Sequence, residues 1–186
     1  MTPEAIYFRD GGPRAGGAFE FFEGADVAIV DFLQEATSAS GFAENLVEFL
    51  HEAVKTYCPH EKPPLSAEGQ YLGRAGHPAV YVLTSEIGEA TFESASLGLR
   101  LVTELWTFAE HSDARVAIRD ALAISGAMAS LLGQSSYMGS SHLWATHYWN
   151  AYPEAITQIT QERVLMQETF AGVRLTLPWH HQETME

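Results

Sequence analysis

Hydrophobic positions along the chain recur mainly at helical spacing, and the segment between Gly41 and Pro59 shows this best. Gly41, followed three residues later by Glu44, is typical of a helix N-terminus, and Pro59 cannot continue a helix. A helix with one buried face is therefore predicted there, on an apolar stripe formed by Phe42, Leu46, Phe49, Leu50, Ala53, Val54 and Tyr57.

Four further segments favour helix. Residues 25–36 and 97–109 repeat apolar groups at helical spacing, although β-branched residues also allow a strand in the first of them. Ser112 is a suitable N-cap for a helix that Gly133 would end. The proline at 153 suits the first position of a helix over about 153–166.

Short aromatic runs near 4–9 and 18–22, an unbroken apolar run near 79–84 and an alternating run near 172–177 predict four strands. A glycine-rich link joins the first two, and the prolines and glycines of 58–78 favour a surface loop. No sequence repeat and no second apolar core follow a linker. The prediction is therefore an α+β fold in one compact domain over 1–186, mainly helical, with a small sheet built from these short strands.

Composition and charge narrow the class of protein. The chain has 186 residues, with 24 acidic against 10 basic side chains and a net charge of −14. Such a charge repels phosphate backbones and anionic lipids, so nucleic acid and membrane are poor partners. Neither a secretion signal nor an apolar run near the roughly 20 residues of a membrane span occurs. With one cysteine, Cys58, no internal disulfide is possible, and a cytoplasmic protein is expected.

Searches for catalytic and metal-binding patterns give no candidate residue. Eight histidines are present, but His142 and His147 are five residues apart and so lie on different faces of a helix, and no HExxH occurs. The serines of 135–141 lack the GxSxG turn of a serine nucleophile. Cys58 falls at the predicted helix C-terminus, which raises a thiol pKa. The glycines of 11–17 match no phosphate loop, so no cofactor is predicted.

Acidic residues repeat every four positions in the two N-terminal helical segments. Glu44, Glu48 and Glu52 form one row opposite the apolar stripe, and Asp31 and Glu35 form a second pair. One interpretation is a solvated face that keeps the protein soluble. The other is a docking surface for a basic protein, because complementary charge accelerates association.

Three functions are compatible with these features. The preferred hypothesis is an acidic binding protein, in its sharpest form an immunity or inhibitor protein that neutralises a basic cognate toxin such as a nuclease. The second is a small enzyme whose histidine and acid come from distant parts of the chain. The third is a structural or adaptor subunit of a homo-oligomer that associates through an aromatic cluster, Trp144, Tyr148, Trp149 and Tyr152.

Overall fold

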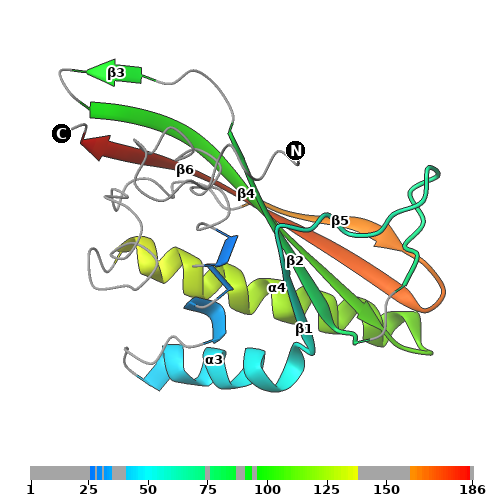
Figure 1. The fold of residues 1–186 in the computed structure, drawn as a ribbon. Helices are drawn as coiled ribbons and strands as arrows, with labels where there is room; N and C mark the ends of the chain where they lie inside the picture. The colour runs from blue at the N-terminus through cyan, green and yellow to red at the C-terminus, as the bar shows by residue number, and fades with distance from the viewer. Residues whose placement is uncertain are drawn as a thin grey trace, which may run out of the picture.

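A mixed β-sheet with helices packed on one face forms the protein (Figure 1). The computed structural model describes residues 26–27, 29–30, 32–34, 41–73, 76–86, 91–93, 96–137 and 160–184. The named elements are, in chain order, α3 (Gly41–Ala53), β1 (Thr56–Pro59), β2 (Ala79–Glu86), β3 (Thr91–Glu93), β4 (Ser96–Glu110), α4 (Ala114–Tyr137), β5 (Thr160–Met166) and β6 (Phe170–Thr184).

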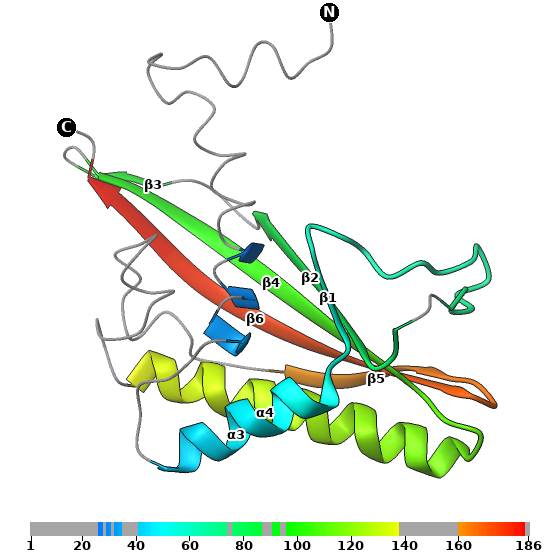
Figure 2. The ribbon, with the colours of Figure 1, turned by 60° about the horizontal axis from the view of Figure 1, so that its bottom comes forward.

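The strands follow the order β1-β2-β4-β6-β5, and β3 pairs with the start of β4. The β1–β2 pair is parallel and the other pairs are antiparallel. β4 and β6 pair over their full length, from Ser96 opposite Thr184 to Glu110 opposite Phe170. This long pair forms the middle of the sheet, and Figure 2 shows α3 and α4 together on the same side of it.

The core lies between the sheet and the helices. Buried residues of β2, β4 and β6, among them Val82, Leu105 and Leu175, pack against Leu50 of α3 and Met128 of α4. Ile29, Val30, Phe32 and Leu33 of the helical residues within 26–34 join the same cluster. Burying these side chains is the main favourable term in folding, at roughly 1.5–3 kcal/mol for each large aliphatic or aromatic group.

The prediction of a mainly helical fold with a small sheet is wrong. Among the described residues, those in strands outnumber those in helices, and β4 and β6 are each 15 residues long. The predicted helix over 97–109 is β4. Its apolar residues fit a helical spacing because both faces of the strand are buried. Leu105 faces the helices, while Phe108 on the other face stacks on Tyr71. A strand buried on both faces loses its simple alternation.

The other predicted elements have mixed outcomes. The strands near 79–84 and 172–177 are confirmed as parts of β2 and β6, and the described residues of 26–34 are helical. The helix from Gly41 ends at Ala53, not at Pro59, so Cys58 lies in β1. Residues 160–166 form β5, so the helix over 153–166 is wrong there. The strands near 4–9 and 18–22, and residues 153–159, lie outside the described part of the chain.

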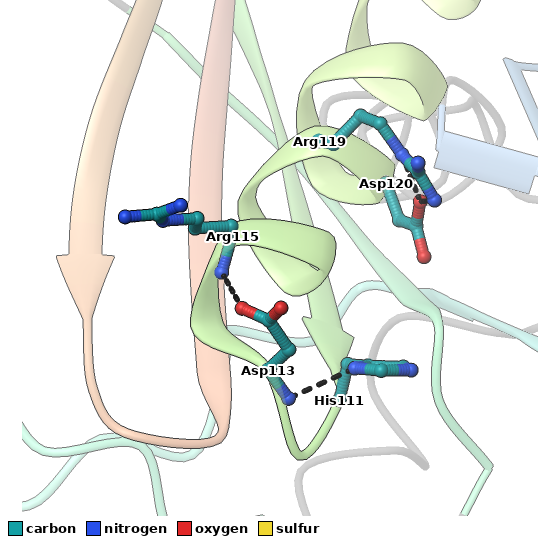
Figure 3. Close-up of polar contacts among 5 residues, drawn as sticks. All are labelled: His111, Asp113, Arg115, Arg119 and Asp120. Atoms are coloured by element: carbon teal, nitrogen blue, oxygen red, sulfur yellow. Dashed lines mark hydrogen bonds and ion pairs between the residues drawn. The ribbon is translucent and has the colours of Figure 1, made fainter.

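α4 begins one residue later than its predicted cap implies. The Asp113 carboxylate accepts a hydrogen bond of 2.9 Å from the Arg115 backbone N–H, so Asp113 is the N-cap (Figure 3). The Asp113 backbone N–H donates to His111 Nδ1 at 2.9 Å and fixes the turn that leaves β4. The helix continues past Gly133 to Tyr137, and it packs on β4 and β6. Across the described residues, no helix is long and apolar enough to span a membrane.

Two glycines give opposite expectations for substitution by alanine. A Cβ on Gly172 in β6 would lie 2.6 Å from Phe108 Cε1 and 3.0 Å from Leu165 Cβ, whereas a Cβ on Gly126 in α4 meets nothing within 4 Å. Gly172→Ala should lower the free energy of unfolding by about 1–3 kcal/mol through overpacking. Gly126→Ala should raise it by about 0.5–1 kcal/mol through helix propensity. Urea denaturation measures both, and an unchanged or more stable Gly172→Ala variant contradicts the packing described.

Candidate functional site

The acidic row predicted for the first long helix lies on α3. Glu48 and Glu52 are exposed, while Leu50 and Val54 are buried in the core. Glu44 belongs to α3, but its side chain lies outside the description, and Asp31 and Glu35 are outside the described residues. The structure thus places two of the five predicted residues on one solvent-facing surface of a single helix.

Phe49 changes the character of this surface. It was expected in the buried stripe, yet 39% of it is exposed, and it follows Glu48 and precedes Glu52 by one helical turn. Its position at the border of the stripe explains the difference, because the core contacts are made by Leu46, Val47, Leu50 and Ala53. We call Glu48, Phe49 and Glu52 the α3 face, a surface with an aromatic ring beside two carboxylates.

A second set of polar side chains meets inside the molecule. Asp26, only 1% exposed, accepts a hydrogen bond of 2.5 Å from Thr84 Oγ1 on its Oδ1. Its Oδ2 lies 3.1 Å from Nδ1 of His60, whose side chain is 34% exposed. Thr84 Oγ1 is 2.8 Å from Thr103 Oγ1, and since Thr84 gives its proton to Asp26, Thr103 donates to Thr84. We call these four residues the Asp26 network.

Four separate parts of the fold position the Asp26 network. Thr84 of β2 and Thr103 of β4 are direct partners in the sheet, so both hydroxyls point to the helix side. Asp26 comes from the helical residues within 26–34, and His60 follows the last residue of β1. The His60 backbone has φ 64°, in the left-handed region, and its N–H donates to the Val82 carbonyl at 2.9 Å. These contacts hold the imidazole beside the buried carboxylate.

Burial controls the electrostatics of Asp26. Desolvation raises the pKa of this carboxyl above its ordinary value of 3.8, while hydrogen bonds from Thr84 and His60 and the charge of His60 oppose the rise. A buried carboxylate is costly unless it is hydrogen-bonded, and here both oxygens have partners. The arrangement can hold a negative charge inside the protein and orient an imidazole toward the surface.

Sequence patterns did not reveal the Asp26 network. Asp26 and His60 are 34 residues apart and belong to no motif of fixed spacing. The only sequence signal was the hypothesis of a histidine paired with a distant acid, which named no residues. Within the part of the chain that the structure describes, no three histidine, cysteine or acidic residues group together as metal ligands. The aromatic cluster of Trp144, Tyr148, Trp149 and Tyr152 is outside that part.

On the opposite face of the sheet, one arginine pairs with two glutamates. Arg174 of β6 bonds to Glu104 of β4 at 3.4 Å and to Glu162 of β5, and its guanidinium lies 5.1 Å from the Trp106 ring centre. At one end of this face Tyr71 stacks on Phe108. Such half-exposed ion pairs contribute little stability, and one guanidinium between two carboxylates leaves this cluster with a net charge of −1.

No family model matches the chain, and no curated protein matches its sequence.

Stability as a function of pH tests the burial of Asp26. Because its pKa is raised in the folded protein, its favourable contribution is complete below the unfolded value of 3.8 and is lost as pH rises through the folded value. Asp26→Asn removes this titration. The unfolding free energy of Asp26→Asn minus that of the wild type should therefore increase as pH rises from about 3.5 to 7.

Urea denaturation at several pH values measures this difference. Glu48→Gln, which neutralises an exposed carboxylate on α3, is the matched control and should give a much flatter difference. If the Asp26→Asn difference does not change with pH, the carboxyl is not desolvated in the folded protein.

Proposed function

We propose that this chain is an acidic binding protein that docks a basic protein through the α3 face. The observation that carries the proposal is the side-by-side exposure of Glu48, Phe49 and Glu52 on a helix whose other side is fixed in the core. Helix α3 packs on α4, which packs on β4 and β6, so the surface is presented on a supported element. A preorganised surface loses little conformational entropy on binding.

Charge and the aromatic ring have different roles in this proposal. The net charge of −14 attracts a basic protein over long range and raises the association rate. Exposed carboxylates alone add little affinity, because water and salt screen them. A partly exposed phenylalanine supplies apolar area that a partner can cover, and aromatic anchors of this kind slow dissociation.

The partner class that fits best is a basic toxin, for example a nuclease. Nuclease sites are basic because they bind phosphate, and an acidic protein can cover such a site without any catalytic residue of its own. We therefore propose an immunity or inhibitor function, exerted in the cytoplasm by direct binding. The same charge disfavours nucleic acid and anionic membranes as partners.

Charge reversal on α3 tests the acidic half of the surface. The partner is first isolated from the native source with the immobilised wild-type protein at low salt. Glu48→Lys/Glu52→Lys should then reduce the association rate with that protein at least about ten-fold at low salt, and less at high salt, because the effect is electrostatic. Stopped-flow or biosensor kinetics measure the rates.

The matched control for this test is Glu110→Lys/Glu168→Lys, which changes the net charge equally at two exposed positions outside α3. If the control slows association as strongly as the α3 variant, attraction is due to net charge and α3 is not the docking surface. If only an acidic protein is isolated, the basic-partner proposal is wrong.

Truncation of the aromatic ring tests the apolar half. Phe49→Ala should increase the dissociation rate by about ten-fold or more while leaving the salt dependence of association unchanged, because the ring acts only after contact. The same biosensor measurement gives both rates. Circular dichroism checks that the half-exposed position does not unfold α3, and an unchanged dissociation rate removes Phe49 from the interface.

A further inference from the structure

A partly exposed imidazole, that of His60, is hydrogen-bonded to the buried carboxylate of Asp26. Asp26 Oδ2 lies 3.1 Å from His60 Nδ1, and an ionised carboxylate can only accept a hydrogen bond. Nδ1 therefore carries the proton, and Nε2 keeps its lone pair. No hydrogen bond of Nε2 to another described residue occurs, and 34% of the side chain reaches solvent.

The rest of the Asp26 network keeps the imidazole in this state. The Thr84 hydroxyl donates a hydrogen bond to the second carboxylate oxygen of Asp26, and the Thr103 hydroxyl donates one to Thr84. The hydrogen bond from the His60 backbone N–H to the Val82 carbonyl fixes the backbone of His60. The carboxylate cannot turn away, so the tautomer with a basic Nε2 is maintained, as in sites where a buried acid orients a histidine base.

We propose that His60 and Asp26 form a proton-transfer site that hydrolyses carboxylic esters with water as the nucleophile. This activity is separate from the binding function proposed above and uses a different part of the chain. His60 Nε2 is the catalytic group, and Asp26, which acts through His60, is a positioning residue. Water is the nucleophile because no hydroxyl or thiol of the described residues bonds to Nε2.

The reaction balances without a further reactant. Nε2 accepts a proton from water as the water oxygen bonds to the ester carbonyl carbon. The tetrahedral intermediate then collapses, the bond between carbon and the alcohol oxygen breaks, and Nε2 returns the proton to that oxygen. A carboxylic acid and an alcohol leave. The net charge of −14 disfavours phosphate esters and other anionic substrates, and the substrate class that we propose is therefore a neutral acyl ester.

The probe is 4-nitrophenyl acetate, whose hydrolysis releases a coloured phenolate. His60→Gln should lower the rate constant of the full-length protein at least about ten-fold, within the usual range for loss of a general base. Asp26→Asn should lower it as well, because an amide no longer selects one tautomer. His51→Gln, at an exposed position on α3, is the control and should retain the wild-type rate.

Outcomes other than this pattern overturn the proposal. A His60→Gln rate equal to the wild type shows that His60 only tethers the helical residues around Asp26 to the sheet. An equal loss in His51→Gln shows non-specific reaction of surface imidazoles. A second measurement does not depend on folding of the variants: diethyl pyrocarbonate is added to the wild type, and modification of each histidine is followed by mass spectrometry. Loss of hydrolysis must track modification of His60, and hydrolysis that persists when His60 is fully modified contradicts the proposal.

Discussion

The antiparallel pairing of β4 with β6 over 15 residues is the constraint on which the other described features depend. It places Leu105 beside Leu175 on the helix side, where α4 covers both strands. Since α3 packs on α4, the direction of the α3 face follows from the same pairing. β2 pairs with the other edge of β4 in a register that sets Thr84 opposite Thr103. The two hydroxyls form the hydrogen-bonded pair to which Asp26 binds through Thr84.

A short connection links the two proposed sites. The backbone N–H of Lys55, just after α3, donates to the Pro78 carbonyl at 2.8 Å, next to the start of β2. The chain then runs through β1, parallel to β2, and reaches His60. The end of α3 and the position of His60 are thus fixed by the same strand pair. This explains how one segment of about 20 residues supplies both an exposed acidic helix and a histidine that is hydrogen-bonded to a buried carboxylate.

Local patterns predicted the elements whose burial leaves a simple trace in the sequence: one apolar stripe in α3, alternation in β6 and an unbroken apolar run in β2, which is buried on both faces. The start of the helix at Gly41, the described helical residues within 26–34 and the strands near 79–84 and 172–177 were all predictable. β4 was not, because Val102 and Phe108 are buried on one face and Leu101 and Leu105 on the other, and four such residues also fit a helix. The length of β6 depends on pairing with β4, which no local pattern reports.

The two candidate sites also differ in how far the sequence predicts them. The α3 face follows from spacing within one helix, so Glu48 and Glu52 could be chosen from sequence, whereas the exposure of Phe49 depends on how α3 sits on the core. The Asp26 network needs the three-dimensional approach of residues up to 77 positions apart in sequence, from Asp26 to Thr103. Only the existence of such a histidine–acid pair could be hypothesised in advance.

The central claim is that a basic protein covers the α3 face. Hydrogen–deuterium exchange of the full-length protein, alone and with the basic protein isolated on it, tests this most directly, because exchange reports each segment without any substitution. If the basic protein covers α3, exchange across Gly41–Ala53 is slower in the complex. Protection confined to other segments, with exchange in α3 unchanged, would contradict it.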